Sequence, residues 1–388
     1  MDYTKEVFLK LLANCICEEE IISEIDFEKL DSEELIHLSR VNTVAAIVYS
    51  ALKDFGEVPT DLLNELKNGF AKTVTKMSKY DTVQEKIVEQ LNNSDFPYAF
   101  VKGKTIAKYY PNSSLREMSD LDVLVYPEDF GKAKKIFDSF CSEKPEQVDN
   151  EYEYSYMLNN VTIELQNNLA YEKNLSGKVD YEKYFGDLLS HRTMDGDVSV
   201  IEPSHSFIYT IYHMAQHFYY SGCGVRMIID VAVFIKYFRD IFDWDQVLET
   251  LKSLELLEFA TNVFSIIDEW FGLKVPGDIF QKREVSDECL QYILNAGVFG
   301  RETINSDVAN VRRKESFFKW AFPSYSYMRQ YSDWFENKPA FLLPVAYIVR
   351  IFKGLGKRGG IVKGISVTGQ TKKDLESHKK IVGLMGLE

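Results

Sequence analysis

Two aspartates lie two residues apart at the start of a short apolar run. The run DLDVLVY (120–126) has the composition of a buried strand, and this would place Asp120 and Asp122 on the same face. Two carboxylates this close repel each other, and a bound divalent cation is the usual reason for such a pair. The chemistry that this pattern predicts is the binding of Mg²⁺ or Mn²⁺.

A third carboxylate, Glu164, lies in the run VTIELQ (161–166), which reads as a neighbouring strand with Gln166 on the same face. Three carboxylates on adjacent strands can hold two divalent cations roughly 3.5–4 Å apart, the arrangement used for in-line phosphoryl transfer. Glu151 and Glu153 are alternative third carboxylates, and a solvated acidic turn is the alternative for the aspartate pair. We favour the metal site, because a glycine turn lies upstream of the aspartates and a further carboxylate lies downstream.

Glycine and basic residues precede the aspartates. The run YAFVKG (98–103) reads as a buried strand that ends at Gly103, directly before a short helix. A glycine there lets backbone N–H groups and the helix N-terminus approach a phosphate. Lys102 and Lys104 flank it as counter-charges, and Arg116 in the following loop could offer a guanidinium fork to a phosphate. A solvated loop arginine is an equally good interpretation of Arg116.

The order Lys-Gly, short helix, Tyr-Tyr-Pro, Arg and then Asp-x-Asp on a strand resembles the DNA polymerase β-like nucleotidyltransferase superfamily. It resembles more closely a family of candidate nucleotidyltransferases that carries Lys-Gly where the superfamily has Gly-Ser. The resemblance spans about residues 95–240. It implies catalysis by Asp120, Asp122 and Glu164, with an NTP as substrate and ATP as the favoured NTP. Lys104 stands where the superfamily has a hydroxyl, which leaves open which residue donates to the phosphates.

The resemblance also implies a helical stretch with paired histidines and an Arg…Asp pair, here His213, His217, Arg226 and Asp230. We expect these residues on the wall of an acceptor cleft, with a histidine as general base. The alternatives are a polar strip at a domain interface for the histidines and an intrahelical ion pair for Arg226 and Asp230.

The elements that must position these residues change character twice along the chain. Helical spacing dominates residues 1–90, strand-like runs occupy 91–202, and helical spacing returns over 203–388, which ends in a basic tail. Asn159-Asn160 separates two strand-like runs as a hairpin turn, because Asn tolerates positive φ. We therefore expect an α+β protein with a polymerase β-like α/β core, a mixed sheet with helices, between two helical regions.

Composition excludes several classes of protein. The 388 residues are 45% hydrophobic and carry a net charge of −14, which argues against electrostatic capture of nucleic acid by the whole surface. Five cysteines without metal-ligand spacing argue against a disulfide scaffold and a zinc ribbon. The start lacks the pattern of a signal peptide, and residues 341–352 are too short to span a membrane, so we expect a cytoplasmic protein without a membrane span. The segment from Ile351 onward is basic, with eight Lys or Arg residues and three Asp or Glu residues.

Three functions agree with these patterns. The first is metal-dependent transfer of a nucleoside monophosphate from an NTP to a hydroxyl or phosphate of a small-molecule or protein acceptor. The 3′-hydroxyl of RNA stays open as an acceptor, although the body lacks the basic surface expected for it. The second is a non-catalytic nucleotide-binding or regulatory module, and the third is a component of a toxin–antitoxin-type stress system.

Overall fold

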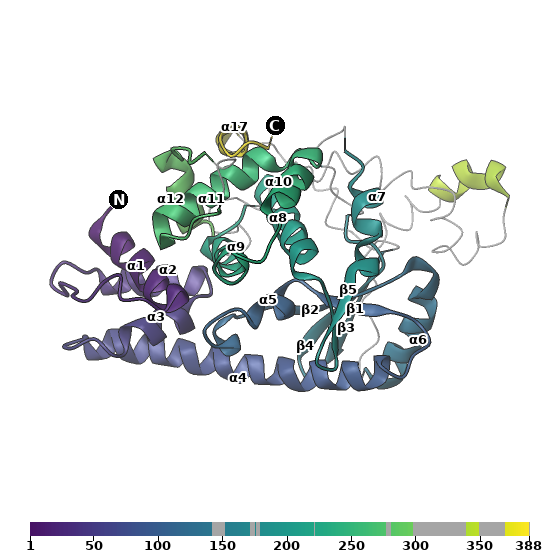
Figure 1. Ribbon diagram of the computed structural model, residues 1–388, viewed down its shortest axis with the longest axis horizontal. Coiled ribbons are helices and arrows are strands. Elements are labelled where there is room, and N and C mark those ends of the chain that lie inside the picture. The colour runs from purple at the N-terminus through teal and green to yellow at the C-terminus, as the bar shows by residue number, and fades with distance from the viewer. Residues whose placement is uncertain are drawn as a thin grey trace. The chain divides into compact units, whose positions relative to one another are not determined.

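The computed structural model (Figure 1) describes residues 1–141, 152–170, 175, 179–220, 222–276, 281–297, 339–348 and 369–387. The chain divides into two compact units, one of residues 1–148, 152–303 and 381–388 and the other of 149–151 and 304–380. The described residues of the second unit include η4 (Ala340–Leu342) and the first part of α17 (Gly369–Leu384). Four of the eight basic residues of the expected tail fall on 351–368, outside the described residues, and the other four lie in α17.

Helices form the first part of the first unit. Two of them begin at aspartate caps: the Asp2 carboxylate accepts from the Lys5 backbone N–H and that of Asp31 from the Glu34 N–H, each at 3.0 Å. The helices are α1 (Tyr3–Cys17), α2 (Ser32–Val41), α3 (Ala45–Leu52) and α4 (Thr60–Leu91).

The sheet has six strands in the order β3-β4-β2-β1-β6-β5 and is mixed. The central strand β2 (Asp120–Val125) pairs in parallel with β4 (Val161–Gln166) and antiparallel with β1 (Tyr98–Val101). Strand β3 (Glu153–Leu158) forms an antiparallel hairpin with β4. The α+β class and the mixed sheet expected from the sequence are confirmed, with strands rather than helices at 120–125 and 161–166.

The hairpin between β3 and β4 turns at Asn159-Asn160, as predicted. Both asparagines have positive φ, 52° and 62°, and Leu158 faces Val161 across the turn. This two-residue turn determines the register of the whole hairpin, because each step away from the turn pairs one residue of β3 with one of β4.

Two strands went unpredicted. Strands β5 (Arg192–Asp195) and β6 (Val198–Ile201) form a hairpin, and β6 adds to the sheet in parallel with β1. Each strand is only four residues long, and β5 is exposed along its length. Strand β5 is solvent-facing and lacks the apolar alternation by which strands are recognised, and β6, although buried, is too short to show a clear pattern.

Separate hydrophobic cores cover the two faces of the sheet. The second half of α4 and the helix α6 (Phe130–Phe140) pack on the face that carries Leu121 and Val123. The opposite face, which carries Val101 and Leu124, belongs to the larger core built with the later helices (Figure 1). Because side chains alternate along a strand, Asp120 and Asp122 lie on the same face as Leu124.

The later helices contain the longest apolar surfaces of the chain. Buried aromatic side chains such as Phe207, Phe234 and Phe264 pack against one another in this core. The remaining described elements of the first unit are α5 (Gly103–Ala107), η1 (Ser113–Leu115), η2 (Pro127–Asp129), α7 (Tyr181–Gly186), η3 (Leu188–His191), α8 (Pro203–Tyr220), α9 (Val225–Phe238), α10 (Trp244–Ser253), α11 (Leu257–Phe271) and α12 (Asp287–Asn295).

Candidate active site

Three carboxylates share one face of the sheet because β2 and β4 run parallel in register. Asp120 lies beside Thr162, and Asp122 lies beside Glu164. The Gln166 side-chain amide donates to Asp122 Oδ1 at 3.1 Å and to Glu164 Oε2 at 2.9 Å. The strands thus bring together the acidic residues that the sequence indicated. The side-chain amide of Gln166, which the sequence placed on the same face as Glu164, hydrogen-bonds to two of them.

A fourth carboxylate, Glu153, enters the same group from β3. It lies opposite Gln166 in the hairpin register, and the Gln166 amide approaches its Oε2 at 3.4 Å. Sequence reasoning held Glu153 only as a rival to Glu164, and the other rival, Glu151, lies outside the described residues. Counting back from the Asn159-Asn160 turn would have identified the neighbour of Gln166.

Lys102 supplies a positive charge to this carboxylate group. Its Nζ lies 2.5 Å from Asp122 Oδ1 and 4.0 Å from Glu164 Oε2. Burial disfavours the charged ammonium, but Asp122, with Glu164 and Asp120 beyond it, outweighs burial and holds the pKa of Lys102 well above its ordinary value. Lys102 therefore stays protonated, as a counter-charge within the group.

One lysine does not balance this many carboxylates. Asp122 is only 2% exposed, and its burial, with Asp120 and Glu164 nearby, raises its pKa well above the ordinary value against the opposing effect of Lys102. Burial likewise raises the pKa of Glu164. A buried group with excess negative charge is a place where a further cation would be stabilising.

The oxygen donors of this group are of the kind that Mg²⁺ and Mn²⁺ prefer, and in this respect the residues fit such an ion. Within the described ranges, however, Asp120, Asp122 and Glu164 do not form a set whose oxygens all lie within 4.8 Å of one another. The Lys102 ammonium is bonded to Asp122 instead. Binding of a divalent cation would require Lys102 to withdraw and the carboxylates to rotate inward.

The turn after β1 has an unusual backbone at Lys102. This residue has φ 57° and ψ −132°, a region that costs a non-glycine residue roughly 1–3 kcal/mol. The next residue, Gly103, has no room for a side chain, because a Cβ there would lie 2.5 Å from Arg116 Nη1. The glycine thus permits close approach of the Arg116 guanidinium.

Arg116 belongs to a buried network with α9. Its Nε and Nη2 donate to the two carboxylate oxygens of Asp230, each at 2.7 Å, and the Tyr110 hydroxyl donates to Asp230 at 2.6 Å. Arg226, one turn before Asp230, donates from Nη1 to Thr43 Oγ1 and to the Glu117 carbonyl, each at 2.9 Å. Burial and the nearby Arg116 lower the pKa of Arg226.

This network holds the loop that leads into β2. Asp230 pairs with Arg116, not within its own helix with Arg226, and 114 residues separate the partners. Asp230, predicted for the acceptor wall, therefore contacts Arg116, the arginine predicted for phosphate binding. Their side chains fix the chain just before Asp120.

Three further predicted residues lie on α5 and α8. Lys104 forms an ion pair with Asp81 of α4 and donates to it, so α4 braces the turn after β1. On α8, His213 and His217 lie one turn apart with their Nε2 atoms 3.2 Å apart. The ring of His213 lies 6.0 Å from that of Tyr209. Burial raises the pKa of Tyr209, and the charge of Lys102 opposes that rise. His213 thus lies one turn after Tyr209 along α8, and His217 one turn further.

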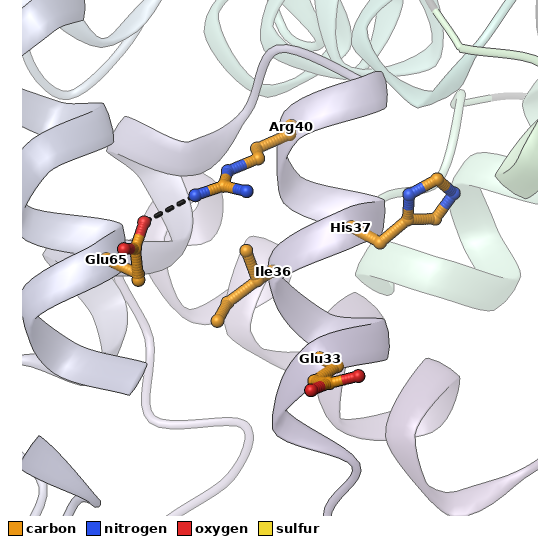
Figure 2. Close-up of a pocket in the computed structure, with 5 residues that line it drawn as sticks. All are labelled: Glu33, Ile36, His37, Arg40 and Glu65. Carbon is orange, nitrogen blue, oxygen red and sulfur yellow. Dashed lines mark hydrogen bonds and ion pairs between the residues drawn. The ribbon is translucent and has the colours of Figure 1, made fainter. Parts of the chain in front are cut away.

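A separate hollow of about 360 Å³ lies between α2 and α4 (Figure 2). It is lined by Glu33, Ile36, His37, Arg40 and Glu65, and Arg40 donates to Glu65 across it. None of the residues singled out from the sequence takes part. An exposed ion pair with no buried polar group is a feature of ordinary protein surface.

Comparison with known proteins gives one match. A family model described as an uncharacterised nucleotidyltransferase matches residues 28–272, which include β1 to β6 and every residue predicted for the site. No curated protein and no solved structure matches the chain. Within the described residues, no helix is both long enough and apolar enough to cross a membrane.

Proposed function

The chain belongs to the family of uncharacterised nucleotidyltransferases, and from this premise we propose a metal-dependent reaction for it. It transfers a nucleoside monophosphate from an NTP, ATP first, to a hydroxyl or phosphate of a small-molecule or protein acceptor. The observation that carries the proposal is the in-register placement of Asp122 and Glu164 on adjacent parallel strands, with Asp120 on the same face. A buried carboxylate group with excess negative charge has no other evident use in the core.

Asp120, Asp122 and Glu164 would hold Mg²⁺ or Mn²⁺, and Glu153 would add charge behind Gln166. Bound there, the ion would neutralise the triphosphate and activate the attacking oxygen. Lys102 has a second task in this proposal. When Asp122 turns to a cation, the ammonium loses its partner, and its long flexible side chain can pair with a phosphate oxygen instead. The same lysine would balance the site before and after substrate binds.

Helix α8 supports an acceptor position over this face of the sheet. The charge of Lys102 acts on the pKa of Tyr209, and the ring of His213 lies 6.0 Å from that of Tyr209 on the same helix. A histidine within hydrogen-bond reach of an acceptor hydroxyl could take its proton, since the ordinary pKa of a histidine is about 6.5. We therefore retain His213 and His217 as the acceptor side of the site and assign Arg226 and Asp230 to holding the loop before Asp120.

The acceptor is a small molecule or a protein, not a nucleic acid, in this proposal. The net charge of −14 opposes the phosphate contacts on which nucleic-acid binding depends. All five cysteines are free, which agrees with a reducing compartment such as the cytoplasm.

The test is transfer of label from α-³²P-labelled NTPs with Mg²⁺ or Mn²⁺, using an extract of small molecules and proteins as the acceptor pool. We expect label on an acceptor and release of pyrophosphate, with ATP the best donor. The control is Glu65→Gln, which removes an exposed carboxylate outside the site, while Asp120→Asn removes one inside it. Nucleotide binding without pyrophosphate release in any metal would instead establish the non-catalytic module.

A further inference from the structure

A second group of metal-ligating side chains lies apart from the carboxylates, where β6 meets α8. His191 ends η3, Glu202 follows β6, and His205 lies in the first turn of α8. One ligand atom from each of the three lies within 4.8 Å of the other two, and in the described part of the chain no other three His, Cys, Asp or Glu residues meet this condition. None of the three has a role in the proposed transfer reaction.

The backbone brings these residues together without help from distant segments. In the β5–β6 hairpin, Arg192 pairs with Ile201, so His191 and Glu202 are the next residues at its open end. The Glu202 N–H donates to the His191 carbonyl at 2.9 Å and closes that end. His205 lies three residues after Glu202 on the helix, and its Nδ1 is 3.5 Å from Glu202 Oε2.

The two imidazoles stack with ring centroids 3.6 Å apart and planes 15° apart. The side chains of Glu202 and His205 are 50% and 26% exposed, so an ion could enter from solvent. Tetrahedral Zn²⁺ with bonds of about 2.0–2.2 Å needs ligand atoms about 3.4 Å apart, which rotations about the side-chain bonds can supply from the observed spacing.

We propose that His191, Glu202 and His205 bind a zinc ion, with the fourth position open to water. Two imidazoles and one carboxylate are a donor set that Zn²⁺ accepts, whereas Mg²⁺ prefers oxygen ligands alone. Strands β1 and β6 are parallel, with Phe100 beside Val200, so Glu202 and Lys102 follow their strands at the same end of the sheet. The protein would therefore hold two kinds of cation at this end.

A zinc ion here would tie the β5–β6 hairpin to the first turn of α8. That helix carries Tyr209, a buried residue close enough to Lys102 for the ammonium to act on its pKa. The ion would thus fix the start of the helix that covers the candidate active site. This role is positional, and its test requires neither nucleotide nor acceptor.

The experiment is calorimetric titration of chelator-treated full-length protein with Zn²⁺ in a large excess of Mg²⁺, with thermal unfolding in parallel. We expect one zinc per chain and a rise in Tm on binding. The variants His205→Gln and Glu202→Gln should each weaken zinc binding at least about 10-fold. The matched control is His37→Gln, an exposed histidine on α2, which should bind zinc as the wild type does.

Two further measurements keep the proposal open to refutation. Glu202 is half exposed, so Glu202→Gln should unfold at the wild-type temperature without zinc, and its loss of binding then reflects the ligand rather than the fold. His213→Gln tests the histidine pair on α8 as a rival zinc site. The proposal is overturned if no zinc binds, if both ligand variants bind normally, or if His213→Gln alone abolishes binding.

Discussion

Two groups of buried charges lie at the two ends of the short loop before β2, and they differ in how their charges are matched. At the Arg116 end, the guanidinium makes a two-bond contact with Asp230, and the Tyr110 hydroxyl donates to the same carboxylate. At the Asp120 end, several carboxylates share Lys102 and the amide of Gln166.

The comparison teaches how to separate a structural charge cluster from a ligand site. Arg116 and Asp230 carry opposite charges and join in two hydrogen bonds, and breaking such a buried pair costs stability. A buried group with excess charge of one sign raises the pKa of its own members and gains from a ligand of opposite sign. The sequence marked both groups as candidate site residues, and only their partners distinguish them.

The largest expected effect is a loss of catalysis when the carboxylate group is changed. If catalysis were unaffected, the distinction between a ligand site and a structural cluster would fail. Asp120→Asn should lower nucleotidyl transfer by at least about 100-fold, because it removes charge that would hold the catalytic ion. Asp120 is only partly buried, so the free energy of unfolding should change little. Steady-state label transfer and urea unfolding of the same preparation measure both effects. Normal turnover in this variant would contradict the metal assignment.

The next effect is on stability. Asp230→Asn should lower the free energy of unfolding by about 3–5 kcal/mol, because it leaves the Arg116 guanidinium buried without its charge partner. Urea denaturation measures the loss. Glu65→Gln is the control, since its exposed pair with Arg40 should contribute less than about 1 kcal/mol. Equal effects of the two substitutions would show that the Arg116 network is not a structural cluster.

A third substitution sharpens the difference by removing the shared cation. Lys102→Met leaves the buried Asp122 without its ammonium, so the metal-free protein should lose about 1–3 kcal/mol of stability. Mg²⁺ should restore more stability to this variant than it adds to the wild type, because no ammonium competes for the carboxylates. Thermal unfolding with and without Mg²⁺ gives the comparison, and an identical Mg²⁺ response in both proteins would count against it.

The smallest expected effect is a loss of stability at Gly103, which lies between Lys102 of the carboxylate group and the side chain of Arg116. Gly103→Ala would place a Cβ against Arg116, which Asp230 prevents from moving away, and we expect a loss of about 1–2 kcal/mol. Gly131→Ala in α6 is the matched control, because a Cβ there would meet nothing within 4 Å and alanine favours the helix. The two variants should therefore shift the urea midpoint in opposite directions.

Local patterns in the sequence predicted the elements around the site because the determinants are local. Asn159-Asn160 determines its own turn, alternation identifies β2 and β4, and together they indicate that Asp122 and Glu164 share a face. The pairing of Arg116 with Asp230 could not be predicted in this way. It joins a loop to a helix 114 residues later, and nothing near either residue specifies the other.

The positions of Lys102 and Lys104 show the same limit. Both were predicted to bind phosphate because they flank a glycine, and that prediction remains untested. The structure adds their partners in the folded chain, Asp122 for one and Asp81 for the other. Those partners depend on a strand pairing and on the path of α4, which the residues next to Gly103 do not encode.

The path of α4 also bears on how this protein could change in evolution. Leu62 and Leu66 near the start of the helix lie in one hydrophobic core, while Val83 and Ile87 near its end lie in the other. A gene segment that encodes only the first helices, or only the sheet, would leave one half of α4 with an apolar stripe and nothing to cover it. Recombination that separates the two would therefore be selected against, and the N-terminal helices should be inherited together with the sheet.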